Sequence, residues 1–165
     1  MGRDERRLAP GLALLAVLFV ACRARPATDV ATAPFADDQA AVERTLRDLL
    51  AAAERRDVDR VEAHHLYGPK FTKFDDWAPA RQDADAARRA ERNGISGVVA
   101  FRPTVEDLKV DVFGPVAIAT FVMPYVVVTE RGSLDARARA TMVFVKVGAE
   151  WKVSHEHFSA VPGPP

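Results

Sequence analysis

The sequence predicts an α+β domain in which a cone-shaped, curved antiparallel sheet wraps around about three N-terminal helices. Apolar residues recur at helical spacing in the first half of the chain, whereas apolar segments separated by turn residues fill the second half. The helices come first and the strands follow, which favours an α+β layout. Pro124, inside the long apolar segment 116–129, predicts a bulge or bend there. A bent sheet of long strands can enclose the helices and leave a cavity at its open end.

Residues 37–56 are predicted to form a long amphipathic helix, with Asp37 or Asp38 as its N-cap. A second, short helix is expected at residues 58–65, with Asp57 as its cap. The apolar positions that should face inward in the first helix are Val42, Leu46, Leu49, Leu50 and Ala53.

The segment between the second helix and the sheet is more varied. Gly68 and Pro69 break the helix, and residues 71–74 predict a short strand. Residues 83–92, rich in Ala and Arg, predict a third helix that ends at Asn93 and Gly94. The remaining chain predicts an antiparallel meander of four strands: residues 105–113, 116–129, 134–147 and 150–159.

The N-terminus has the pattern of an export signal. Three arginines precede the uncharged, mostly apolar residues 8–21, a run shorter than the ~20 residues of a spanning helix. Residues 19–22, Phe-Val-Ala-Cys, resemble a bacterial lipobox, in which the cysteine receives a lipid. We therefore expect a lipoprotein signal peptide at 1–21, lipidation of Cys22, a flexible tether at 22–36 and one domain at 37–162.

The alternative is an ordinary secretory signal cut near Ala24 or Ala33. The expected location is the cell envelope, with membrane attachment through the lipid only; the alternative is periplasmic or secreted. Cys22 is the single cysteine, so one chain cannot form an internal disulfide.

Composition narrows the possible functions. Lys and Arg number 23 and Asp and Glu number 23, without a basic patch, which argues against nucleic acid as a partner. The mature domain has no Gly-rich phosphate loop, nucleophile elbow or cysteine site. We expect no cofactor.

The last predicted strand carries a motif, W-x-x-x-H-x-H-x-S-x-x-P, from Trp151 to Pro162. With residues 68–75, it resembles the SnoaL-like branch of the nuclear transport factor 2-like superfamily. The pattern is also similar to the association domain of calcium/calmodulin-dependent protein kinase. This resemblance implies a cone with a pocket, and a homodimer through the outer face of the sheet. The positions that match the association domain are Thr141, Trp151, His155, His157 and Ser159.

The resemblance also indicates the pocket wall. The arginines that line the pocket of the association domain fall on Val122, Met142 and Phe158, none of them basic. Strand alternation adds Phe144 to this wall, and Tyr67 and Trp77 lie on the segment that covers such pockets. We expect these residues to contact an unidentified apolar or amphipathic small molecule, with Glu156 as the single carboxylate of the wall.

Glu156 and His65 are the candidate catalytic residues. Burial among apolar side chains should raise the pKa of Glu156 and suit it to a general base. His64 or His65 is expected to form an acid–base pair with Glu156 or Asp75. Alternatively, Glu156 lies at the rim or pairs with Arg137 or Arg139, and the histidine interacts with the dipole at its helix end.

His155 and His157 should share a strand face with Trp151 and Val153, opposite Glu156. We predict no metal site, because the pair lacks a third ligand nearby.

The sequence is compatible with three functions. We expect binding of a small molecule without evident catalysis. The first alternative is an isomerase, cyclase or hydrolase with Glu156 as general base. The second is a dimeric protein-interaction module.

Overall fold

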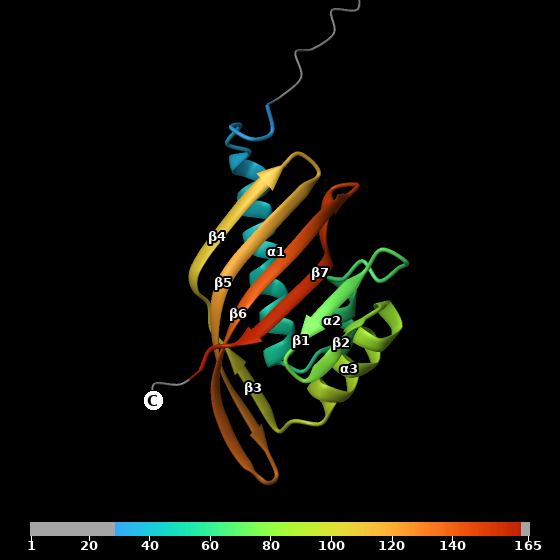
Figure 1. Ribbon diagram of the computed structural model, residues 1–165, viewed down its shortest axis with the longest axis vertical. Coiled ribbons are helices and arrows are strands. Elements are labelled where there is room, and N and C mark those ends of the chain that lie inside the picture. The colour runs from blue at the N-terminus through green and yellow to red at the C-terminus, as the bar shows by residue number, and fades with distance from the viewer. Residues whose placement is uncertain (1–28, 163–165) are drawn as a thin grey trace, which may run out of the picture.

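The computed structural model describes residues 29–162, which form three helices and one curved, open sheet of seven strands (Figure 1). The predicted α+β architecture is confirmed. The helices are α1 (Ala36–Glu54), α2 (Val58–Ala63) and α3 (Ala84–Ser96). The strands are β1 (Thr72–Asp75), β2 (Ala78–Gln82), β3 (Ala100–Pro103), β4 (Glu106–Phe113), β5 (Val116–Thr129), β6 (Gly132–Val147) and β7 (Glu150–Ala160).

The strand order is β2-β1-β7-β6-β5-β3, and β4 also pairs with β5. The strands β4, β5, β6 and β7 form the predicted antiparallel meander of four strands. β1 instead runs parallel to β7, with Thr72 opposite His155 and Phe74 opposite His157. This pairing brings an early segment of the chain beside the last strand.

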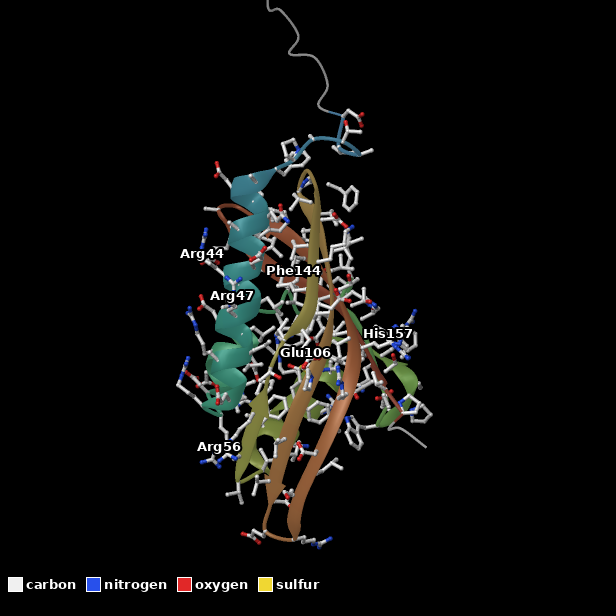
Figure 2. The ribbon with its side chains drawn as sticks, turned by 90° about the vertical axis from the view of Figure 1, so that its left-hand side faces the viewer. Arg44, Arg47, Arg56, Glu106, Phe144 and His157 are labelled. Carbon is white, nitrogen blue, oxygen red and sulfur yellow. The ribbon has the colours of Figure 1, made fainter. Side chains whose placement is uncertain are left out.

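The helix α1 lies against one face of the sheet and buries its apolar stripe there (Figure 2). Arg44 and Arg47 point away from the sheet, as expected for the polar side of an amphipathic helix. The N-cap position is occupied by Phe35 in the left-handed conformation, with a φ of 42°. The prediction of Asp37 or Asp38 as the N-cap is therefore wrong. Both carboxylates lie in the first turn, where they interact favourably with the helix dipole.

Pro124 lies where β5 changes its neighbour on one side. β4 pairs with β5 from Val116 to Val122, and β3 pairs with it from Tyr125 onward. The carbonyl of Pro124 accepts a hydrogen bond from the backbone N–H of Thr104, at 2.8 Å. The pairing of β5 with β6 continues through Pro124 without a shift, whereas β4 has an irregularity after Glu106. The missing N–H of proline is thus tolerated at a junction between two partner strands.

Several predicted boundaries differ from the structure. The strands β2 and β3 are short and contain Pro79 and Pro103, so they carry no clear alternation. The helix α3 does not end at residues 93–94 but continues to Ser96. The second helix ends at Ala63 instead of residue 65.

A bulge at Ser154 decides which side chains of β7 face inward. The pairing with β6 shifts between Val143, opposite His155, and Phe144, opposite Val153, so Ser154 has no partner residue. As a result, Trp151 and Val153 lie on the same side of the sheet as Glu156 and Phe158. The prediction that placed Trp151 on the face of His155 and His157 is wrong, because simple alternation does not cross a bulge. Figure 2 shows Phe144 between α1 and the sheet and His157 on the other side.

The inward face of the sheet is filled by α1 over one part of its length. There the core includes Leu46, Phe144, Trp151 and Val153, all at most 3% exposed. Farther along β5, β6 and β7, the same face borders a cavity. Among residues 29–162, no helix is long and apolar enough to cross a membrane.

Candidate functional site

A cavity of about 560 Å³ lies between the helices and the inward faces of β5, β6 and β7. Its volume is that of a small-molecule site, commonly ~300–1,000 Å³. Apolar side chains from α1, α3 and the sheet make up most of the wall, including Leu50, Ile95, Phe101, Met123, Ala138, Met142 and Phe158. The charged residues of the wall are His65, Lys73, Asp75, Asp76, Glu91 and Glu156. The expectation that Glu156 is the single carboxylate of the wall is therefore wrong. Three further carboxylates line the cavity, from β1, the β1–β2 turn and α3.

Glu156 lies in the buried part of this cavity and is 3% exposed. Its Oε2 is 3.0 Å from Lys73 Nζ and its Oε1 is 3.3 Å from His65 Nε2. The carboxylate is thus neither at the rim nor paired with Arg137 or Arg139. It is held between two basic groups that strand pairing and a neighbouring turn bring to it.

Lys73 is a site residue that sequence reasoning missed. It alternates with Phe71 and Asp75 along the chain, so it faces inward, and β1–β7 pairing places it opposite Glu156. Its Nζ also lies 2.8 Å from Glu91 Oε1. The available signal was its position two residues after Phe71 on a predicted strand, but the parallel pairing with β7 could not be inferred from that pattern.

Glu91 was also missed. It falls on the inward side of α3 with Ala84, Ala87 and Ile95, at spacings of three and four residues. Its Oε2 accepts a hydrogen bond from the Tyr67 hydroxyl at 2.5 Å. An acid at a helical position shared with apolar residues was the signal available in the sequence.

His65 is held at the end of α2 by backbone pairing with β7. The N–H of Leu66 donates to the carbonyl of Val153, and the N–H of Val153 donates to the carbonyl of His64. The His65 Nδ1 lies 2.8 Å from the Val61 carbonyl, which can only accept, so Nδ1 carries a proton. Its Nε2 is then the atom that faces Glu156. Between the two histidines considered from the sequence, His65 lines the cavity.

The charges of this network shift one another's pKa values. Burial opposes ionisation of Glu156, but Lys73 and His65 outweigh it and hold the pKa of the Glu156 carboxyl below its usual range. Burial also opposes protonation of His65, but Glu156 and Glu91 outweigh it and raise the His65 pKa. Burial and the nearby Glu156 charge raise the pKa of Glu91, despite the attraction of Lys73. The expected rise in the pKa of Glu156 is therefore wrong, because its partners were not visible in the sequence.

The exposed lining residues mark the mouth of the cavity. Asp76 and Trp77, in the turn between β1 and β2, are exposed, and Trp77 retains 72% of its accessible surface. Tyr125 on β5 also lines the cavity, and its ring lies 5.9 Å from that of Phe101. The cavity thus runs from an aromatic and acidic mouth to a buried ionic network.

Comparison with known proteins identifies the family. The profile of the SnoaL-like domain matches residues 42–164. The chain belongs to the SnoaL-like domain family. A comparison with curated proteins gives no match.

Solved structures confirm the fold of this SnoaL-like chain. A protein of the NTF2-like family from Streptomyces avermitilis, provisionally named a dehydratase, has a TM-score of 0.70 and 18% identity, over 77% of this chain and 98% of that one. An NTF2-like superfamily protein from Salmonella enterica has a TM-score of 0.71 and 12% identity, over 79% and 96%. The CaMKII hub of S. rosetta has a TM-score of 0.61 and 25% identity, over 74% and 96%. The resemblance to the kinase association domain, as well as to the superfamily, is confirmed.

Of the six residues predicted to contact a ligand, three line the cavity and three do not. Met142, Phe158 and Trp77 line the cavity of this SnoaL-like domain. Phe144 lies fully buried in the core under α1. Two others do not line the cavity: Val122 lies one residue from the inward-facing Met123, and Tyr67 lies behind Glu91. The lipidation candidate Cys22 lies outside the described residues.

The buried network also has the composition of a metal site. His65, Glu91 and Glu156 offer ligand atoms that lie within 4.8 Å of one another. However, the Lys73 ammonium lies 2.8 Å from Glu91 and 3.0 Å from Glu156 and supplies the positive charge between them. This SnoaL-like site is therefore arranged around an internal cation.

Proposed function

We propose that this protein binds a small, largely apolar molecule with a polar group in the cavity between its helices and its sheet. The observation that carries the proposal is a cavity of about 560 Å³ with a mostly apolar wall and a cluster of fixed charges on one side. Apolar walls supply affinity by burial, and a few placed polar groups supply orientation. The cavity volume also argues against the alternative of an interaction module with a collapsed cone.

The surroundings of Glu156 favour binding over the general-base role considered from the sequence. A general base is most effective when its pKa lies near the working pH. Lys73 and His65 lower the pKa of Glu156 instead. A carboxylate stabilised in its charged form by two partners is a weak proton acceptor but a good structural anchor.

Native mass spectrometry of the purified protein tests this proposal. We expect the wild-type chain to carry a co-purified small molecule. Ala138→Phe should exclude it, because Ala138 is 3% exposed and lines the cavity. Arg139→Phe, at an exposed neighbouring position of β6, is the matched control and should retain it. Equal retention by both variants would contradict the proposal.

A second candidate function is proton transfer by His65 and Glu91. The pKa of Glu91 is raised while that of its neighbour Glu156 is lowered, and such divergent pairs are typical of acid–base sites. Protonated His65 is suited to donate a proton, and Glu91, when ionised, to accept one. The similarity to a provisionally named dehydratase agrees with this class of reaction.

Kemp elimination of 5-nitrobenzisoxazole tests this second candidate. The substrate is small and apolar, and its ring opens when a base removes one carbon-bound proton, which releases a coloured phenolate. We expect Glu91→Gln to reduce turnover by about 100-fold, the lower range for a general base. Glu62→Gln, on α2 outside the cavity, should leave it unchanged. A rate equal to that of the buffer for the wild-type protein would remove this candidate.

We also propose attachment to the membrane through a lipid on Cys22 and a homodimer through the outer face of the sheet. The sequence of residues 19–22 supports the lipid anchor. Palmitate labelling lost in Cys22→Ser would test the anchor.

The homodimer is supported by a partly exposed aromatic cluster in which the Phe74 ring lies 5.9 Å from that of His157. Light scattering of Phe74→Asp, which should be monomeric, would test the dimer.

A further inference from the structure

The charges that line the cavity do not balance. In the buried network, Lys73 and protonated His65 stand against Glu156 and Glu91. This leaves two further lining carboxylates, Asp75 and Asp76, and no arginine lines the cavity in residues 29–162. The ligand site as a whole therefore has an excess of negative charge.

Asp75 has only a distant basic neighbour. Its Oδ2 lies 3.9 Å from Lys73 Nζ, farther than either of the glutamates that the same ammonium contacts. Burial raises the pKa of Asp75 despite that lysine. Within the described chain Asp76 forms no ion pair, and it is exposed at the mouth. A positive group entering the cavity would meet both carboxylates.

One buried oxygen atom of the same wall, Oε1 of Gln82, has no hydrogen-bond donor among the described residues. Gln82 lies opposite Lys73 in the β1–β2 pair. A buried acceptor without a donor favours a ligand that brings an N–H group or positive charge.

Aromatic rings accompany the excess charge at the mouth. Trp77 follows Asp75 and Asp76 directly, and Tyr125 lines the cavity from β5. Burial raises the pKa of the Tyr125 hydroxyl, and the charges of Asp76 and Asp75, which line the same cavity, add to this rise. Aromatic faces beside carboxylates are the surroundings that bind ammonium groups.

We propose that the ligand is a cation: an apolar molecule with an amine or quaternary ammonium group that binds at Asp75, Asp76, Trp77 and Tyr125. Its apolar part extends along Met142 and Phe158. This inference deepens the proposed function and rests on it. The cavity would thus bind cationic ligands, and the turn between β1 and β2 would contact their ammonium group.

Isothermal titration with three probes of equal chain length tests the inference: octyltrimethylammonium, 1-octanol and octanoate. We expect the cation to bind about tenfold more tightly than octanol, with octanoate the weakest, because a desolvated cation–aromatic contact and ion pairs add to apolar burial. The difference should decrease at high salt. Asp75→Asn with Asp76→Asn should bring the cation within about threefold of octanol, while the affinity for octanol stays the same.

Control variants distinguish the loss of charge in the cavity from a general effect of the substitutions on folding. Asp48→Asn with Asp135→Asn removes two exposed carboxylates that do not line the cavity, and this variant should behave as wild type. Asp76→Asn alone, at an exposed turn, gives a milder variant if the double change unfolds the chain. Equal affinity for the cation and octanol, or tighter binding of octanoate, would overturn the cationic class but leave the cavity as a ligand site. No binding of any probe would overturn the proposed function as well.

Discussion

The inward face of the sheet is packed as a core along one part of its length and borders a cavity along another. Under α1, Phe144 and Val153 are completely buried in a close-packed core. Farther along the same strands, Met142 and Phe158 face a cavity of about 560 Å³. The residues alternate in the same way in both regions, so alternation alone does not distinguish a core from a pocket. The end of α1 and part of α3 border the cavity, whereas the earlier part of α1 covers the packed core.

A network of buried charges lies between the two regions; we call it the ionic boundary, and it consists of His65, Lys73, Glu91 and Glu156. Glu156 follows the bulge that separates it from Val153, and Lys73 lies beside it on β1. Buried charges of this kind are stable only while each has its partners. The comparison therefore predicts two levels of sensitivity: large losses of stability at the ionic boundary and in the packed region, and small losses around the cavity.

Removal of the central cation should be one of the two most destabilising changes. Lys73→Met leaves Glu156 and Glu91 buried without their shared ammonium, and we expect a loss of about 3–5 kcal/mol in the free energy of unfolding. Urea denaturation provides the measurement. Lys70→Met, an exposed neighbour, is the control and should change little. A small effect of Lys73→Met would mean that the network is not a structural boundary.

Two phenylalanines of the sheet allow a direct comparison of the packed and open regions. Phe144→Ala should lower the free energy of unfolding by about 3–5 kcal/mol, because it leaves a void in a close-packed core. Phe158→Ala should lower it by about 1–2 kcal/mol, because the side chain already borders open space. Equal losses, measured by urea denaturation, would mean that the two regions are packed alike.

Only the cavity variant of this pair should change ligand binding. Phe158→Ala should weaken binding of octyltrimethylammonium, whereas Phe144→Ala should leave it within about twofold, provided the variant is folded. Titration calorimetry at a temperature where both are folded gives the comparison.

Much of the fold could be predicted from the sequence. The first helix and the strands from residue 116 onward were predictable, because their apolar periods are long and regular. The short strands β2 and β3 were not, because prolines interrupt them. The family motif was also sufficient for the fold, since the residues from Trp151 to Pro162 are specific for it.

The site was only partly predictable, for two physical reasons. The bulge at Ser154 moves Trp151 and Val153 to the inward face, and nothing in local alternation indicates it. Lys73 and Glu91 meet Glu156 only through the parallel β1–β7 pairing and the packing of α3, which are long-range contacts. Glu156 and His65 were found as candidates, but the sign of the Glu156 pKa shift depended on the partners that could not be seen.

The ionic boundary should also make stability depend on pH in both directions. The Glu156 pKa is lowered from its ordinary value of 4.5, so its contribution is present above pH 4.5 and is lost as the pH falls below it. The His65 pKa is raised from 6.5, so its contribution is present below pH 6.5 and is lost as the pH rises through the higher folded value. Glu91 acts in the other direction on the acid side: its pKa is raised from 4.5, so its contribution is present below pH 4.5 and is lost as the pH rises through the higher folded value.

We therefore expect Glu156 and His65 together to contribute most to stability between about pH 4.5 and 6.5, set by their ordinary pKa values. Urea midpoints measured across pH should show this maximum in the wild type. His65→Gln should flatten the decline on the alkaline side, while His157→Gln, on the outer face, should not. An unchanged alkaline decline in His65→Gln would show that His65 is not part of the coupling.

The smallest expected effect concerns the helix that covers the open region. Gly94 lies inside α3, and a methyl group placed there would meet no atom within 4 Å. Gly94→Ala should raise the free energy of unfolding by about 0.5–1 kcal/mol, because alanine favours the helix. The thermal midpoint measures this change. Destabilisation by Gly94→Ala would indicate that α3 is not continuous through this position.

NMR of the methionine methyl groups tests most directly whether the cavity is the binding site. The chain has three methionines, and Met123 and Met142 both line the cavity. Titration of ¹³C-methyl-labelled protein with octyltrimethylammonium should shift both signals to saturation, and Ala138→Phe should abolish the shifts. If both signals stay unchanged while the probe binds, the ligand site lies elsewhere on the molecule, and the assignment of the cavity as the binding site is contradicted.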